Sequence, residues 1–355
     1  MSDIPQEIVT EMLIRLPVEP LLRFRCVCKP WCALIDSQEF IKLHMKQNLE
    51  SDRKLFLSGE TLQAIDFDTI FTDNVAEIIN VDPPVRVRSI GIEVIGCCNG
   101  LVSLYGSRYN RESVIMMWNP NTRKFQELPC LGKCDLNTNF GFGYDVPEVE
   151  FLEKDRCKLG GDCGVFAVGA LHWVVGSSMF SPLQHIFAFD LATEKCQLVP
   201  QPECYVSEES HMDLAVLRGH LCLLFSFERE YADIWIMKDY GVKESWTKLA
   251  SFVNSDLLSF GCLFPMSFSK SGKQILLNKD DEGLICYDPE EKSTWNVNLQ
   301  GTLKKYLQFG VCSESLVRLR SCVPTDAKGG DQGLSKKKKS PKSGGFLSTG
   351  FKLVL

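Results

Sequence analysis

Residues 4–31 read IPQEIVTEMLIRLPVEPLLRFRCVCKPW, and this stretch decides how the N-terminal part of the chain folds. Its apolar residues recur at three- and four-residue steps, which is the spacing of one face of an α-helix. The members of this face are Ile4, Ile8, Met12 or Leu13, and Leu16. Pro5 suits the first turn of a helix and Pro17 stops one, so we predict a first helix over about residues 5–15.

Two further helices are predicted before residue 48. Pro20 can begin the second, Pro30 interrupts it before Trp31, and a third short helix runs toward His44. Three helices of this length make only a small core, so part of their apolar surface needs a partner. We therefore predict a three-helix domain over residues 1–48 that binds another protein.

From about residue 54 to residue 319 the pattern changes to short strands with glycine-containing turns. A glycine followed by an apolar strand, then an apolar-aromatic strand ending in Asn or Asp about 16 to 21 residues later, is the repeat unit that we identify four times. The glycines are Gly100, Gly169, Gly219 and Gly272, at steps of 69, 50 and 53 residues. Steps near 50 match kelch-like blades of four strands, so the sequence predicts an all-β propeller over residues 49–320. Strands near residues 54–57 and 62–67 add a further blade or help to close the ring.

The step of 69 residues is too long for one blade and too short for two. The stretch PEVEFLEKDRCKLGGDCG within residues 145–165 is charged, rich in glycine and weakly periodic. We predict an irregular or shortened blade there, in an α+β chain of helices followed by the propeller.

The C-terminal part has two predicted segments. Residues 321–345 are rich in Lys, Gly and Ser and are expected to be disordered, whereas residues 346–355 turn apolar and are expected to dock as a strand. The run Lys336–Lys339 resembles a nuclear import signal, although a solvated tail has the same composition. Because the N-terminus carries Asp3 and Glu7 where a signal peptide needs a basic start, we expect a cytoplasmic location, a nuclear one, or both.

The N-terminal pattern resembles the F-box family. It reads Ile4-Pro5-x-Glu7-Ile8, Leu16-Pro17 and Leu21-x-x-Phe24-Arg25-x-Val27-Cys28-Lys29-x-Trp31. Residues 95–319 resemble the F-box-associated, kelch-like domain of plant F-box proteins in the pieces CCNGLVSL, WNPNTRKFQELP, GALHWV, DIWIMKDYGVKESWTKL and SFSKSGKQILL. The terminal GFLSTGFKLVL resembles the subgroup of F-box regulators of defence-gene expression, which are associated with turnover of NLR immune receptors. This chain departs from the family after Gly143-Tyr144-Asp145, where about one strand pair is missing.

The resemblance implies a non-catalytic substrate-recognition subunit of an SCF-type (Skp-cullin-F-box) ubiquitin ligase. The F-box would bind the Skp-type adaptor, and through it a cullin, while the propeller would bind a protein substrate such as an NLR receptor. The predicted adaptor-binding residues are Ile4, Pro5, Ile8, Leu13, Leu16, Pro17, Leu21, Leu22, Val27, Cys28, Trp31 and Leu34. Trp31 is the best single anchor, with burial inside the domain as the equal alternative. A propeller interaction protein acting outside a cullin ligase is the alternative function.

Composition and motif spacing argue against other functions. A net charge of -6 without a structured basic patch predicts no nucleic-acid partner, and no apolar run approaches the roughly 20 residues that span a bilayer. Cys130, Cys134, Cys157 and Cys163 form no Cys-x2-Cys pair, so we predict no metal site and no cofactor. The histidines lack protease spacing, and the many Asp and Glu residues leave a propeller glycosidase as a minor alternative.

Overall fold

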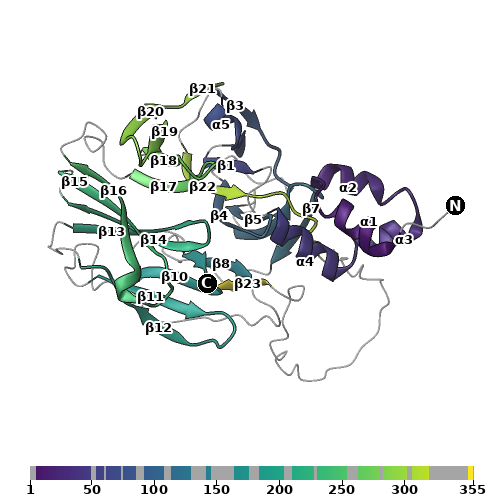
Figure 1. The fold of residues 1–355 in the computed structure, drawn as a ribbon, viewed down its shortest axis with the longest axis horizontal. Helices are drawn as coiled ribbons and strands as arrows, with labels where there is room; N and C mark the ends of the chain where they lie inside the picture. The colour runs from purple at the N-terminus through teal and green to yellow at the C-terminus, as the bar shows by residue number, and fades with distance from the viewer. Residues whose placement is uncertain are drawn as a thin grey trace, which may run out of the picture.

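The computed structural model describes residues 5–48, 53–59, 61–72, 75–84, 92–107, 113–128, 141–144, 164–175, 184–203, 210–227, 230–253, 263–279, 283–301, 306–319 and 351–354. A helical domain lies beside a β-propeller (Figure 1). The predicted tail at 321–345, the residues 145–163 and the four cysteines considered for zinc lie outside the described residues. In the part of the chain described, no helix has the length and apolar character needed to cross a bilayer.

The helical domain has four helices where three were predicted. They are α1 (Gln6–Leu13), α2 (Val18–Phe24), α3 (Lys29–Ile35) and α4 (Gln38–Gln47). Pro30 lies in the first turn of α3, where its missing N–H costs no helical hydrogen bond, so it begins a separate helix. Ser37 caps α4, because its hydroxyl accepts a hydrogen bond of 3.1 Å from the backbone N–H of Phe40.

Five sheets of four or five strands form the blades, as the repeat predicts. The first four-stranded blade has β4 (Ile92–Cys98), β5 (Leu101–Ser107), β6 (Ser113–Asn119) and β7 (Lys124–Leu128). The next has β9 (Val165–Ala167), β10 (Ala170–Val175), β11 (His185–Asp190) and β12 (Cys196–Val199). Then follow β13 (Ser210–Leu217), β14 (His220–Phe227), β15 (Tyr231–Met237) and β16 (Trp246–Val253), with the short helix η1 (Lys243–Ser245). The last has β17 (Leu263–Phe268), β18 (Ile275–Lys279), β19 (Gly283–Asp288) and β20 (Ser293–Asn296).

The fifth blade closes the ring with strands from both ends of the propeller sequence. Its strands are β1 (Lys54–Gly59), β2 (Gln63–Asp66), β3 (Val75–Asn80), β21 (Asn298–Gln300) and β22 (Tyr306–Cys312), and the short helix α5 (Thr69–Thr72) packs beside β3. β1 pairs with β22 in an antiparallel ladder, and β3 pairs with β21 in a parallel one. The early strands therefore both form a blade and close the ring.

The backbone conformation of the turn explains why each repeat has a glycine, since all four glycines have positive φ. In three blades it follows a residue that also has positive φ, in the pairs Asn99-Gly100, Val168-Gly169 and Arg218-Gly219. Two successive positive φ values make the two-residue hairpin turn whose twist matches that of paired strands, and glycine adopts them without steric cost.

A two-stranded sheet explains the long step of 69 residues. Strand β8 (Gly141–Tyr144) contacts β4 of one blade and β9 and β10 of the next. Its antiparallel partner is the C-terminal strand β23 (Phe351–Val354), so the terminal segment does pair with the propeller (Figure 1). The predicted irregular or shortened blade at residues 145–165 falls almost entirely outside the described residues and stays a prediction.

Candidate functional site

Helix α1 has one apolar side that faces solvent and one that faces the core. Ile8 and Met12, four residues apart, are 51% and 62% exposed, whereas Leu13 is 3% exposed and Val9 packs against the core. Residues four apart lie on the same helix face, and Leu13 points more than a quarter-turn away from Ile8. Met12 therefore replaces Leu13 on the solvent-facing side.

The predicted adaptor-binding residues divide into three groups by their place in the structure. Pro5, Ile8, Pro17, Val27 and Cys28 are exposed. Leu16, Leu22, Trp31 and Leu34 are half-buried and pack against the core. Leu13 and Leu21 are buried, and Ile4 lies outside the described residues.

Leu13 and Leu21 correct the sequence prediction. Both belong to one hydrophobic core with Ile95 and Leu101 of the propeller and Leu316 of the segment after β22. Leu21 is 0% exposed, so it offers no surface to another protein. Sequence periodicity marks these leucines as apolar but cannot distinguish an internal partner from an external one.

Trp31 is shared between the two predicted roles. Its ring packs edge-to-face against Phe24 with centroids 5.7 Å apart, and both rings lie against the core. The remaining exposed part of Trp31 is available to a partner. We therefore place it at the border of the candidate face and not at its centre.

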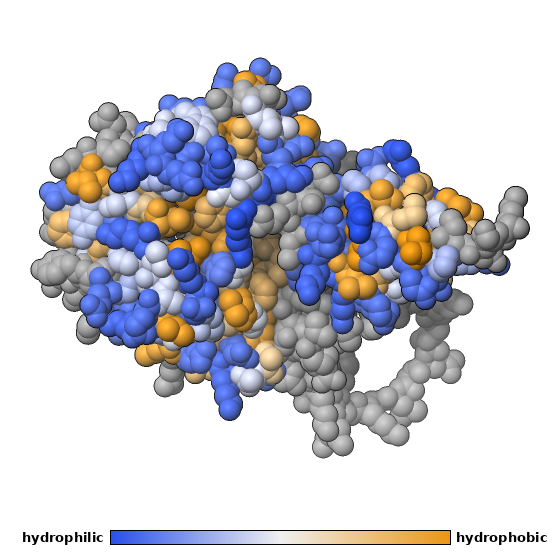
Figure 2. Space-filling model, in the orientation of Figure 1, coloured by the Kyte–Doolittle hydropathy of each residue, from blue (hydrophilic) through white to orange (hydrophobic). Residues whose placement is uncertain are grey.

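The exposed members of the predicted list, together with Met12, form the candidate site. We call them the exposed apolar set, which consists of Pro5, Ile8, Met12, Pro17, Val27 and Cys28. Figure 2 shows apolar surface on the helical domain interspersed with hydrophilic surface. The ion pairs Glu11–Arg15 and Glu19–Arg23 contribute charged, exposed side chains to this domain. Exposed apolar side chains among polar neighbours are typical of a protein-binding surface.

Hydrogen bonds from the C-terminal part of α4 and the residue after it stabilise the helical domain. His44 Nε2 lies 2.8 Å from the carbonyl oxygen of Leu16, and burial lowers the pKa of His44 although this contact opposes the shift. The side chain of Asn48 donates to the carbonyl oxygens of Ile14 and His44 at 2.9 Å. These bonds fix α4 against the loop and helix end that precede α2.

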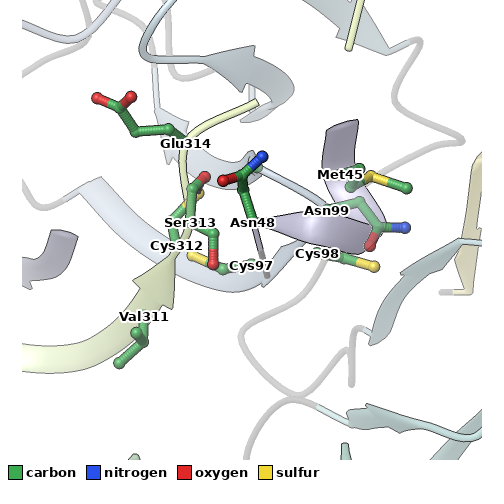
Figure 3. A pocket seen from close by; sticks show the side chains of 10 residues that line it. Met45, Asn48, Cys97, Cys98, Asn99, Val311, Cys312, Ser313 and Glu314 are labelled. Atoms are coloured by element: carbon green, nitrogen blue, oxygen red, sulfur yellow. Dashed lines mark hydrogen bonds between the residues drawn. The ribbon is translucent and has the colours of Figure 1, made fainter. Parts of the chain in front are cut away.

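A cavity of about 60 Å³ lies where α4 meets the propeller. Figure 3 shows Met45 of α4 and Asn48, the residue that follows this helix, on the cavity wall. Asn99 of the β4–β5 turn and Ser313 and Glu314 beyond β22 also line it. A space of this size holds a water molecule or two and no larger ligand. The cavity therefore marks a domain contact and not a substrate site.

A larger groove of about 380 Å³ lies on the blade of β13–β16. Its carboxylate Asp233 is paired with Lys248 at 2.7 Å and accepts a hydrogen bond of 2.6 Å from Ser251. A second wall carboxylate, Glu203, is paired with Lys243 at 3.0 Å. Both acids are held by cations, unlike the acid and base pair of a glycosidase.

Buried reactive groups in the propeller have structural partners. His172 Nε2 lies 2.8 Å from the hydroxyl of Tyr240, and burial lowers the pKa of His172 to about 4. Burial also raises the pKa of the Cys222 and Cys286 thiols to about 12, which makes them poor nucleophiles. Within the described residues, no group of three His, Cys, Asp or Glu side chains is placed to hold a metal ion.

Comparison with known proteins finds full-length relatives. The chain is 27% identical to F-box protein CPR1 of Arabidopsis thaliana, with all of both chains covered, and 26% identical to the F-box/kelch-repeat protein At3g23880 of Arabidopsis thaliana over 70% of this chain and 79% of that protein. The CPR1 alignment spans 427 positions against 355 residues here, so that relative carries residues without a counterpart. Among solved structures, TolB from Acinetobacter baumannii covers 74% of this chain and 61% of its own at 12% identity, with a TM-score of 0.30.

One family match falls in each of the two parts of the fold. Residues 1–43 match the F-box domain, and residues 147–325 match the F-box associated beta propeller domain. The second match alone covers half of the chain and contains the three blades from β9 to β20 together with β21 and β22. This chain therefore belongs to the F-box proteins that carry an F-box-associated β-propeller domain.

Proposed function

We propose that this chain is the substrate-recognition subunit of an SCF-type ubiquitin ligase and has no catalytic role of its own. The observation that carries the proposal is an F-box with exposed apolar side chains at one end of a chain whose other part is a propeller. Such a subunit works by proximity, because it raises the local concentration of substrate lysines near the ubiquitin carrier.

The exposed apolar set would bind the Skp-type adaptor, which in turn binds the cullin. Ile8, Met12 and Val27 keep half or more of their surface exposed in the free chain. Burial of such side chains drives most protein association without any bond-making chemistry. Leu13 and Leu21 would support this face from inside and would not touch the adaptor.

The propeller would bind its protein substrate at the end away from the helical domain. Because neighbouring strands are antiparallel, turns such as Asn99-Gly100 and the turn from β6 to β7 lie at one end of a blade. Met45 of α4 and the following Asn48 meet the propeller at that end. The connections after Ser107 and Phe227 leave from the opposite end, where loops commonly carry binding residues.

As the substrate class we propose NLR immune receptors, with a role in plant defence. This rests on the resemblance of GFLSTGFKLVL to the tail of the F-box regulators of defence-gene expression. A cytoplasmic and nuclear distribution fits that role, with Lys336–Lys339 as the import signal. A reporter fused to the last forty residues should enter the nucleus and lose that preference when the lysines are replaced.

Affinity purification of the full chain from plant cells with proteasome activity blocked tests the function. We expect the Skp-type adaptor, a cullin and stabilised NLR receptors among the recovered proteins. Adaptor without cullin, or neither, would favour the alternative of a propeller interaction protein outside a cullin ligase. Recovery of the ligase subunits with other substrates would overturn the NLR assignment alone.

A further inference from the structure

The segment that follows β22 runs between the helical domain and the blade of β4–β7. We name residues 313–319 the strap. Glu314 accepts a hydrogen bond of 3.2 Å from the backbone N–H of Val18, and Arg318 forms an ion pair with Asp36. Leu316, Val317 and Leu319 of the strap belong to the same hydrophobic core as the helices.

Asn119 holds the strap on the propeller side and is the last residue of a repeat strand. Asn119 at the end of β6 corresponds to Asp190 of β11 and Asp288 of β19. In all three, Oδ1 accepts hydrogen bonds from the backbone N–H groups two and three residues later, at 2.7–3.1 Å. This side-chain turn explains why the repeat strands run into Asn or Asp.

Asn119 differs from the two aspartates because an amide can also donate. Its Nδ2 donates to the carbonyl oxygens of Ser315 and Val317 at 3.0 and 2.8 Å, and its side chain is fully buried. An ionised aspartate has no hydrogen to donate and would set negative oxygens against two carbonyls. One amide thus closes the turn and fixes the strap.

Gly100 lets the strap lie close to the β4–β5 turn. A Cβ atom added at Gly100 would fall within 1.9 Å of Ser315 Cβ, whereas the corresponding Gly219 has nothing within 4 Å. Both glycines have positive φ, at 74° and 77°, so an alanine is strained equally at both. Only at Gly100 does it also displace the strap.

Ion pairs hold the other side of the strap against the helices. Asp36 forms one ion pair with Arg318 of the strap and another with Arg25 of the helical domain, the latter at 2.7 Å. Burial alone would raise the pKa of Asp36, but the hydrogen bonds from Arg25 and Arg318 lower it below its ordinary value. The carboxylate stays charged at neutral pH and bridges the two parts.

We infer that the strap fixes the orientation of the F-box relative to the propeller, with Asn119 as its positioning residue. The functional consequence of this inference rests on the proposed function: a fixed orientation would hold a bound substrate at a set distance from the ligase. The coupling is separate from adaptor binding, because the exposed apolar set takes no part in the strap contacts.

The test compares Asn119→Asp with Asp288→Asn in the full chain. Unnatural spin-labelled residues at the exposed positions Glu11 and Glu244 report the distance between the helices and the propeller. We expect one narrow distance distribution in the unsubstituted chain and in Asp288→Asn, and a broad one in Asn119→Asp. Hydrogen exchange over residues 313–319 should accelerate by about tenfold or more in Asn119→Asp.

Gly100→Ala paired with Gly219→Ala provides an independent perturbation. We expect broadening and faster strap exchange in Gly100→Ala but not in Gly219→Ala. A distribution that stays narrow in both Asn119→Asp and Gly100→Ala would overturn the inference. The affinity for the adaptor should stay within about twofold of the unsubstituted chain in all four variants. If the unsubstituted chain itself binds no adaptor, the proposed function is refuted, but the distance and exchange results still test the role of the strap.

Discussion

The exposed apolar set makes a quantitative prediction about adaptor binding. Ile8, Met12 and Val27 are 51%, 62% and 62% exposed, so each has about half of its side chain left for a partner to bury. Complete burial of such a side chain is worth about 1.5–3 kcal/mol, which gives about 1 kcal/mol for each residue and about 3 kcal/mol for the three. Replacing all three with alanine should therefore weaken adaptor binding by roughly 100-fold.

Isothermal titration calorimetry with the purified adaptor measures this change. The melting temperature of the triple variant should stay within about 2 °C of the unsubstituted chain, because the replaced side chains lie outside the core. Val253→Ala provides a matched control, since Val253 is 64% exposed on the propeller strand β16 and should leave the affinity unchanged. A folded triple variant that binds the adaptor within about twofold of the original affinity would refute the assignment.

Three further predictions concern the core, a buried histidine and the terminal strand. Leu21→Ala should lower the free energy of unfolding by about 2–5 kcal/mol in a denaturant titration, because Leu21 is fully buried in the core shared by the two domains. His172 has a folded-state pKa of about 4, below its ordinary 6.5, so the chain should lose stability as pH falls from 6.5 to 4, by up to about 3 kcal/mol, and be unaffected by His172 above pH 7. His172→Gln should remove this part of the pH dependence, and an unchanged profile would contradict it. Deleting residues 346–355 should speed hydrogen exchange in β8, which loses its β23 partner, while exchange in β14 stays constant.

The sequence predicted the blades well because their signals are local. All four repeats have a positive-φ glycine turn, and in three of them the second apolar strand ends in Asn or Asp, whose side chain bonds backbone N–H groups two and three residues later. The same locality explains the error in helix number. From the sequence, Pro30 interrupts the second helix, whereas in the structure it lies in the first turn of α3 and begins a separate helix.

The candidate site was only partly predictable. Apolar spacing in α1 allows either Met12 or Leu13 on a face with Ile8, and both remained open from the sequence. The structure decides for Met12 because Leu13 is buried in the core that the helical domain shares with the propeller and the strap. The predicted list was consequently right about the helical domain as an apolar module, and wrong in assigning Leu13 and Leu21 to its outer surface.

By itself, the sequence determined a helical module followed by a propeller of four-stranded blades. Periodicity and turn chemistry are properties of neighbouring residues, so no tertiary information was needed for them. Only the tertiary structure decided that β23 pairs with β8 and that Asn119 holds the strap. These contacts join residues about two hundred positions apart. Asn119 occupies the same repeat position as Asp190 and Asp288, so the local sequence gives no sign that it also contacts the strap. Which apolar residues of the F-box remain exposed was likewise decided by the tertiary structure, because Leu13 and Leu21 are buried in a core that also contains propeller and strap residues.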